Sequence, residues 1–259
     1  MSGGLLTINM LLSKPFDRLR ANGLNRRIPG FVFTSSPLSS FRYLRAEILR
    51  YAIGMINQPY IYLASQSPRR RELLHQIGVR FETLLLRNDA RRIVGVDETP
   101  LVAEVPVDYV QRICLAKAAA AWEAILFRNL RKMPVLAADT TVAIDHQIIG
   151  KPRDREEAYL MLRQLSGREH LVYTAVAVKL NEHIESRLST TTVTFAELSE
   201  ERIRRYVAGA EAHDKAGAYG IQGLAGTFVQ RISGSYSGVV GLPLFETTQL
   251  LNSFGCKTP

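Results

Sequence analysis

Residues 63–70 read Leu63-Ala64-Ser65-Gln66-Ser67-Pro68-Arg69-Arg70 and predict the end of a strand, a turn of small residues and the start of a helix. Pro68 suits the first helical position, where no N–H is needed, and Ser67 can cap the helix. The first amides of a helix are unpaired and carry the positive end of its dipole. Together with two guanidinium groups they predict a site for a phosphate-bearing ligand. A capped helix with solvated arginines is the alternative that this stretch alone leaves open.

Size and composition indicate an ordinary globular protein. The chain has 259 residues, of which 46% are hydrophobic and 22% charged, so it can bury the core of one large domain or of two lobes. No apolar run approaches the length of a membrane span. Cys114 and Cys256 form no metal or redox motif. They indicate a reducing compartment, and we predict a cytoplasmic location.

The net charge of +9 is concentrated at the N-terminus. Residues 1–58 contain eight basic and two acidic residues, which account for six of the nine net positive charges. The rest of the chain is only mildly basic, as expected of a protein that binds small anions. We therefore do not expect the main domain to bind nucleic acid.

Residues 1–58 show no sustained hydrophobic period and are interrupted by Gly and Pro. They could be a transit peptide rich in Arg and Ser, or a basic arm for nucleic acid. We favour a third interpretation, in which the start codon is set too early and the native protein begins near Met55. Residues 1–58 are then a non-native or disordered extension, and residues 59–259 form the domain. An N-terminal sequence of the native protein tests this, and a mature start near Met1 would contradict it.

Hydrophobic periodicity predicts the elements of the domain. The predicted strands are 60–64, 79–86, 135–138, 142–144, 148–149, 170–180 and 184–195. The predicted helices are 69–77, 107–128, 155–165, 200–208 and 242–254. This order predicts an α/β fold with a mixed central β-sheet, flanking helices and two lobes around a cleft.

Two polar features stand out among these elements. Asp139 directly follows the buried strand 135–138, and α/β folds place their ligands at the carboxyl ends of such strands. A cap or turn residue is the alternative interpretation of Asp139. The glycine-rich segment 214–223 can bring backbone close to a ligand or form tight turns. The five histidines form no ligand pattern and are interpreted as core or surface residues.

These pieces together resemble a known family. Seven stretches of the chain occur in the order found in the Maf family of nucleoside triphosphate pyrophosphatases, across about 195 residues from Tyr60 to Phe254. They are residues 63–70, 138–140, 150–152, 165–168, 214–223, 234–236 and 240–243. Each stretch alone is weak, but the set in this order is very specific.

The resemblance implies a two-lobed α/β fold related to the inosine triphosphate pyrophosphatases. It implies a hydrolase that cleaves between the α- and β-phosphates and releases a nucleoside monophosphate and pyrophosphate. The cofactor it implies is a divalent metal, Mg²⁺ or Mn²⁺. Residues 219–223 resemble the branch that acts on dTTP and UTP, and modified pyrimidine nucleotides are further candidates. A homodimer, a role in excluding non-standard nucleotides and a link to the arrest of septum formation are also implied.

The resemblance also implies roles for individual residues. The residues implied to hold the triphosphate are Ser65, Arg69, Arg70, Lys117 and Lys151, of which both lysines would otherwise be interpreted as solvated. Asp139 is implied to be the catalytic residue, as the general base or as a metal ligand together with Glu98. Gln222 is implied to read the base, because its amide can both donate to and accept from the imide edge of uracil or thymine. Thr140 and Arg69 are implied to assist this selection.

The chain departs from the family pattern before Met55 and at residues 84–92, where the connection is longer than usual. The second departure affects the placement of Glu98. Two other functions stay open at this point. One is a non-catalytic, nucleic-acid-binding regulator of septum formation that uses the basic N-terminus. The other is a purine-specific pyrophosphatase, which the loop carrying Gln222 disfavours.

Overall fold

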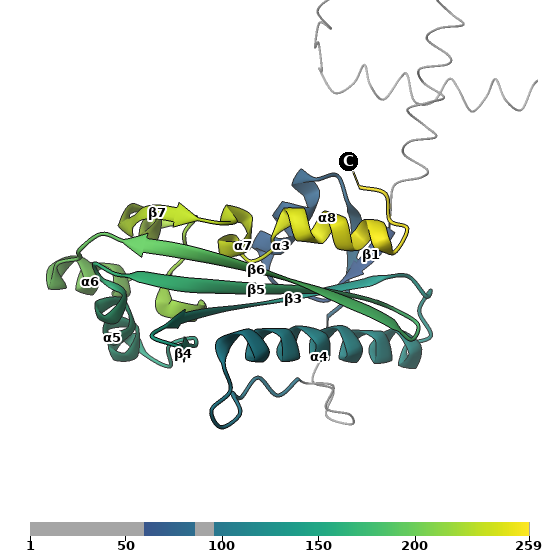
Figure 1. Cartoon of the computed structure of the whole chain (residues 1–259), viewed down its shortest axis with the longest axis horizontal. Helices are drawn as coiled ribbons and strands as arrows, with labels where there is room; N and C mark the ends of the chain where they lie inside the picture. The colour runs from purple at the N-terminus through teal and green to yellow at the C-terminus, as the bar shows by residue number, and fades with distance from the viewer. Residues whose placement is uncertain (1–59, 86–95, 259) are drawn as a thin grey trace, which may run out of the picture. The chain divides into compact units, whose positions relative to one another are not determined.

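A seven-stranded mixed sheet forms the centre of the computed structural model, which describes residues 60–85 and 96–258 (Figure 1). The strands are β1 (Tyr60–Leu63), β2 (Arg80–Thr83), β3 (Val135–Ile144), β4 (Gln147–Ile149), β5 (Glu169–Leu180), β6 (His183–Phe195) and β7 (Val229–Ser233). Their order is β2-β1-β3-β5-β6-β7, with β4 also paired to β3. The β1 strand is parallel to β2 and β3, and the other pairs are antiparallel. The predicted extension 1–58 and residues 86–92 of the long connection lie outside the described residues.

Helices cover both faces of this sheet. They are α3 (Pro68–Gln76), α4 (Pro106–Phe127), α5 (Arg155–Leu165), α6 (Glu200–Val207), α7 (Tyr236–Val240) and α8 (Leu244–Ser253), with short 3₁₀ helices η1 (Ala216–Ala218) and η2 (Leu224–Phe228). Figure 1 shows α4 along one face and α3 with α8 along the other, while α5 and α6 lie at the far end of the long strands. The predicted fold class is confirmed.

Strand alternation divides the core. Side chains of successive strand residues point to opposite faces, so Leu136 and Ala138 pack with α3 and α8, whereas Val135 and Ala137 pack with α4. Because β3 is buried on both faces, its sequence is apolar on either side of the polar residues Asp139, Thr140 and Thr141. A separate cluster around Phe195 forms the core beneath α5 and α6. The two ends of the long strands thus carry separate cores, which correspond to the two predicted lobes.

The prediction that the buried strand ends before Asp139 is wrong. The β3 strand runs through Asp139 to Ile144 without a break. Its parallel pairing with β1 does end, at the pair Leu63–Leu136, but antiparallel pairing with β5 continues as far as Ala143. A strand lasts as long as one of its edges is paired, and the distant partner β5 could not be seen in the local pattern.

This pairing leaves part of one edge of β3 without a strand. On the edge that β1 occupies, pairing stops at Leu136 and resumes only where Val142 meets β4. Between these points no described strand pairs with residues 137–141 on this edge. The gap lies in the middle of the sheet, between the segments that follow β1 and β4.

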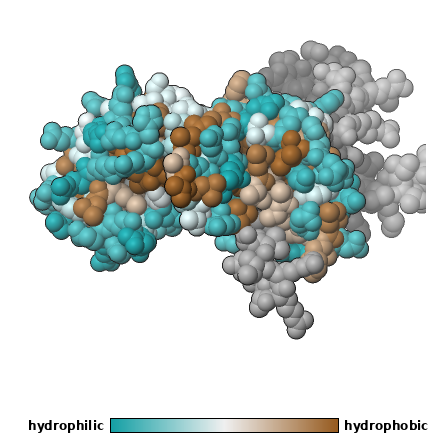
Figure 2. Space-filling model, turned by 60° about the horizontal axis from the view of Figure 1, so that its bottom comes forward, coloured by the Kyte–Doolittle hydropathy of each residue, from teal (hydrophilic) through white to brown (hydrophobic). Residues whose placement is uncertain are grey.

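The surface is mostly polar on the face shown in Figure 2, where hydrophobic residues gather near the middle. Among the described residues, no helix combines the length and the hydrophobicity that a membrane crossing requires.

A buried histidine links the long strands to the glycine-rich loop. His170 is 2% exposed, and its Nε2 lies 2.8 Å from the hydroxyl of Tyr219. Burial lowers the pKa of His170 from 6.5 to about 4. The folded protein therefore holds this ring neutral, whereas the unfolded chain protonates it below about pH 6.5. Stability is lost as the pH falls from 6.5 to 4, because the unfolded state binds the extra proton.

We expect His170→Gln, which can still reach Tyr219 but does not titrate, to reduce this pH dependence. Between pH 7 and pH 4.5 the wild-type protein should lose roughly 2–3 kcal/mol more unfolding free energy than the variant. Urea unfolding at the two pH values measures the difference. Equal losses in both proteins would show that His170 does not couple folding to protonation.

Candidate active site

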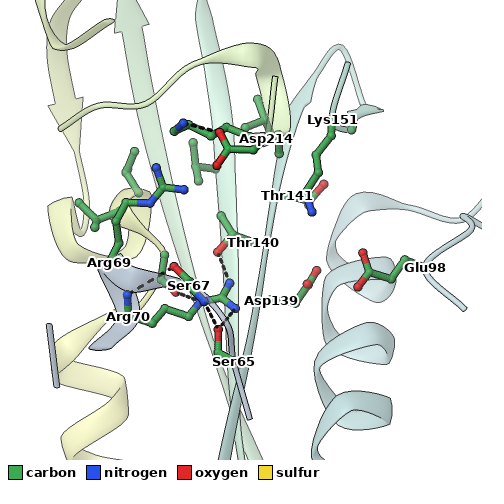
Figure 3. A pocket seen from close by; sticks show the side chains of 18 of the residues that line it. Ser65, Ser67, Arg69, Arg70, Glu98, Asp139, Thr140, Thr141, Lys151 and Asp214 are labelled. Carbon is green, nitrogen blue, oxygen red and sulfur yellow. Dashed lines mark hydrogen bonds and ion pairs between the residues drawn. The ribbon is translucent and has the colours of Figure 1, made fainter. Parts of the chain in front are cut away.

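A cavity of about 810 Å³ opens where the edge of β3 is unpaired. Its walls come from the β1–α3 turn, the middle of β3, the segment after β4, the first half of α4 with the chain before it, and the glycine-rich loop. All nine residues singled out in the sequence line it: Ser65, Arg69, Arg70, Glu98, Lys117, Asp139, Thr140, Lys151 and Gln222. Figure 3 shows the labelled side chains of β3 and α3 facing this space.

Alternation along β3 places two neighbouring residues on opposite sides of the site. Asp139 lies two positions after Ala137, so its side chain points to the same face of the sheet. That face is covered by α4, where Lys117 lies. Thr140 points to the same face as Ala138, toward α3, where its hydroxyl accepts a hydrogen bond from Arg70 at 3.3 Å. Figure 3 shows the two side chains diverging in this way. One strand thus supplies a carboxylate to one wall and a hydroxyl to the other.

Lys117 joins the two carboxylates of the site. Its Nζ lies 2.6 Å from Asp139 Oδ1 and 2.7 Å from Glu98 Oε1. Asp139 is 8% exposed, so its charge needs such a partner. Burial alone would raise the pKa of Glu98, but the hydrogen bond and charge of Lys117 outweigh it, and this pKa lies below its usual value. Both carboxylates are therefore paired with the same ammonium group, that of Lys117.

A hard divalent cation fits this pair of carboxylates. Mg²⁺ prefers oxygen ligands, and it commonly takes one or two carboxylates while keeping waters and substrate phosphates. In residues 60–85 and 96–258, no three or more His, Cys, Asp or Glu side chains gather as a metal site. Glu98 and Asp139 can hold such a metal where Lys117 now pairs with both of them, with the other ligands coming from outside the protein.

Arg70 is largely committed to the protein itself, which the sequence did not indicate. Its Nε donates to Gly241 O at 2.8 Å, and its Nη1 donates to Ala138 O at 2.8 Å and to Ser65 Oγ at 3.3 Å. With the bond to Thr140, four of its five N–H groups are used. Burial lowers the pKa of Arg70, against the opposing charge of Asp139. The guanidinium group therefore donates to the backbone of β3 at the edge where no strand pairs with it.

The start of α3 is built as the sequence predicts. Ser67 Oγ accepts the backbone N–H of Arg70 at 3.4 Å, and Ser65 Oγ accepts that of Ser67 at 3.2 Å. Within the described part of the chain, Arg69 and Lys151 line the cavity without a hydrogen bond or ion pair to another residue. These two cations are therefore available to an anionic ligand.

Residues that the sequence did not single out include Thr174, which hydrogen-bonds Thr140 without lining the cavity, and Asp214, which lines it. Thr174 on β5 lies opposite Thr140, and its Oγ1 is 3.1 Å from Thr140 Oγ1 and 2.8 Å from Gly238 O. Asp214 lines the cavity and pairs with Lys215. The register of β3 and β5 would have revealed Thr174. The position of Asp214 at the start of the glycine-rich segment was its only signal.

Comparison with known families gives the decisive observation. The model of the Maf-like protein family matches residues 60–254. The chain belongs to this family. The match starts with β1 and ends one residue after α8, so it covers every described helix and strand of this Maf-like protein.

Curated relatives cover the same region. A protein of Nitrosomonas europaea named dTTP/UTP pyrophosphatase is 56% identical over 195 residues, which are 75% of this Maf-like chain and 94% of the relative. One of Dechloromonas aromatica with the same name is 51% identical over 197 residues, 76% of this chain and 98% of the relative. The Ham1 protein of Staphylococcus aureus, a solved structure, matches 54% of this chain and 72% of its own, with 14% identity and a TM-score of 0.35. That last likeness is too low to support a conclusion.

Proposed function

We propose that this protein is a nucleoside triphosphate pyrophosphatase that hydrolyses dTTP and UTP to the monophosphate and pyrophosphate. The observation that carries the proposal is that two unpaired cations, a capped helix N-terminus and two carboxylates line one cavity. The relatives named dTTP/UTP pyrophosphatase, at up to 56% identity, support the choice of substrate. Modified pyrimidine nucleotides are further candidate substrates.

One half of the site is suited to the triphosphate. A triphosphate carries about four negative charges, which must be balanced by cations, N–H donors and a metal. Arg69 and Lys151 supply the available charges, and the N-terminus of α3 brings the positive end of its helix dipole beside Ser65. Arg70 has one N–H left for a phosphate oxygen, so its main contribution is to hold the walls of the site in place.

The other half is suited to the hydrolysis. Asp139 is the proposed catalytic residue, because its carboxylate can accept the proton of the attacking water. Mg²⁺ or Mn²⁺, when held by Glu98 and Asp139, would neutralise phosphate charge and acidify that water. Lys117 now pairs with both carboxylates, and it is close enough to contribute its charge to a phosphate bound beside them.

Gln222 is the proposed reader of the base. Its side chain is exposed and lines the cavity, and a side-chain amide can pair with both the carbonyls and the N–H of uracil or thymine. Thr140 and Arg69, which line the same cavity, are proposed to assist this selection.

We expect Gln222→Ala to lower the preference for dTTP over GTP about tenfold, the cost of one missing partner for a polar base edge. The ratio of kcat/KM for the two nucleotides measures it. Gln230→Ala is the matched control, because Gln230 is exposed on β7 and does not line this cavity. An unchanged ratio for Gln222→Ala would remove Gln222 from base selection.

A panel of nucleotides with Mg²⁺ or Mn²⁺, assayed for pyrophosphate release, tests the proposal as a whole. We expect metal-dependent release from dTTP and UTP that is unaffected by deletion of residues 1–54. Preferred release from purine nucleotides would favour the purine-specific alternative. No release, together with salt-sensitive DNA binding by the full chain, would favour the nucleic-acid-binding regulator. The cytoplasmic location, the homodimer and a role in excluding non-standard nucleotides or arresting division remain predictions.

A further inference from the structure

The turn that carries Gln222 is held from behind by residues outside the proposed chemistry. Gly223 N donates to Gly220 O at 3.0 Å, so residues 220–223 form a β-turn with Ile221 and Gln222 at its two central positions. Ile221 packs against both the core beneath α5 and α6 and the core beneath α8. No described residue hydrogen-bonds the side chain of Gln222. The backbone of the turn therefore decides where this side chain lies.

Glu211 provides the main attachment of that backbone. Its Oε2 accepts the N–H of Leu224 at 3.0 Å, and its Oε1 accepts the N–H of Ala225 at 3.4 Å. The hydroxyl of Tyr206 donates to the same Oε1 at 3.0 Å. Charged acceptors make the stronger hydrogen bonds to backbone N–H groups. One partly buried carboxylate thus ties α6 to the first residues of η2, directly after the turn.

The two glycines of the turn fit against this attachment. A Cβ on Gly223 would lie 2.4 Å from both carboxylate oxygens of Glu211. A Cβ on Gly220 would lie 2.9 Å from Cε of Lys215, whose Nζ donates to the backbone oxygen of Glu211 at 2.8 Å. Only residues without a side chain allow the turn to lie this close to Glu211 and Lys215. The close approach is a second, independent sign that the position of the turn depends on Glu211.

We propose that Glu211 is a positioning residue for base selection, because its carboxylate fixes the turn 220–223 and so places Gln222 against the base. This inference rests on the proposed role of Gln222. Glu211 does not line the cavity, so it acts through the turn and touches neither the triphosphate nor the reacting atoms.

The central experiment compares Glu211→Ala with Glu211→Gln. The alanine removes all three hydrogen bonds of the Glu211 carboxylate. The dTTP/GTP ratio of kcat/KM should then fall about tenfold, as for loss of the selecting contact itself. The glutamine keeps one oxygen for Leu224 N–H, and the hydroxyl of Tyr206 can turn to accept from its amide group. It should therefore keep the ratio within about threefold of wild type. Glu201→Ala, which removes a carboxylate paired only with Arg205 on α6, is the matched control and should change nothing.

Pyrophosphate inhibition separates positioning from general damage, since pyrophosphate occupies only the phosphate half of the site. Its inhibition constant should stay within about twofold in Glu211→Ala, because that half lies on other elements. A parallel loss of base preference and pyrophosphate affinity would overturn the proposal. So would an unchanged base preference in Glu211→Ala, or an equal loss in Glu211→Gln.

Gly223→Ala tests the same contact from the other side. Its methyl group would collide with the Glu211 carboxylate, and the residue is exposed, so the variant should fold but lose base preference. In the Glu211→Ala background the collision is gone, and the second change should add nothing further. If the two substitutions had fully additive effects on the dTTP/GTP ratio, the proposal would be overturned. If Glu211→Ala does not fold, Gly223→Ala alone tests the proposal, and an unchanged dTTP/GTP ratio in that variant overturns the proposal.

Failure of this inference can be told from failure of the proposed function. A wild-type protein that releases no pyrophosphate from pyrimidine nucleotides, or a Gln222→Ala variant that keeps its preference, contradicts the proposed function and removes the basis for a role of Glu211. If Gln222→Ala loses the preference while Glu211→Ala and Gly223→Ala keep it, only the inference about Glu211 is overturned.

Discussion

Asp139→Asn is expected to lower the turnover of dTTP by about a thousandfold, the usual contribution of a positioned proton acceptor and metal ligand. The amide keeps the size of the carboxylate but cannot take up a proton from water at neutral pH. It also removes one of the two charges that converge on Lys117. Because Arg69, Lys151 and the start of α3 are untouched, nucleotide binding should remain detectable.

Steady-state pyrophosphate release and nucleotide binding by calorimetry measure the two effects separately. Asp145→Asn is the matched control, because Asp145 lies in the β3–β4 hairpin and pairs only with the exposed Arg168. Its positive φ of 50° is one that Asn also adopts readily. Near-normal turnover in Asp139→Asn would remove Asp139 from the chemistry.

Arg70→Met is expected to lower the free energy of unfolding by about 3 kcal/mol and to reduce turnover as well. The change leaves the carbonyls of Ala138 and Gly241 without the N–H groups that now reach them at 2.8 Å. Each unsatisfied, partly buried acceptor costs about 1–3 kcal/mol. Turnover should fall because the open edge of β3 carries Asp139 and Thr140 and loses the hydrogen bonds that Arg70 makes to Ala138 and Thr140.

Chemical denaturation of Arg70→Met and Arg71→Met gives the comparison. Arg71 lies on the same helix, but its side chain makes only one exposed hydrogen bond, to the carbonyl of Gln66 at 2.9 Å. Arg71→Met should therefore cost less than about 1 kcal/mol. Arg70→Lys should fall between the two, because an ammonium group cannot reach all four acceptors at once. If Arg70→Met were as stable as Arg71→Met, the guanidinium group would not support the site.

Local sequence signals were sufficient for most elements. The predicted helix 155–165 has the bounds of α5 in the structure, because Asp154 caps it and four buried residues recur at helical spacing. Ser199 and Ser67 mark the starts of α6 and α3 for the same reason. The predicted helix 242–254 is α8, which begins two residues later, at Leu244, and the short helix α7 (Tyr236–Val240) that precedes it was not predicted.

The site could be predicted only in part. Its nine residues line one cavity, as the resemblance to the family implied. The bonds among them could not be predicted, because they join distant segments. Arg70 and Gly241 are 171 positions apart, and Lys117 and Asp139 meet only because α4 packs on the odd-numbered face of β3. Sequence spacing carries no information about such contacts until the strand order is known.

The products of dTTP hydrolysis test the central claim most directly. Phosphorus NMR of dTTP incubated with the full chain and Mg²⁺ or Mn²⁺ distinguishes cleavage at the α–β bond from cleavage at the β–γ bond. We expect dTMP and pyrophosphate in equal amounts with the wild-type protein, and neither at a comparable rate with Asp139→Asn. Release of dTDP and orthophosphate, or intact dTTP with the wild-type protein and both metals, would contradict the claim.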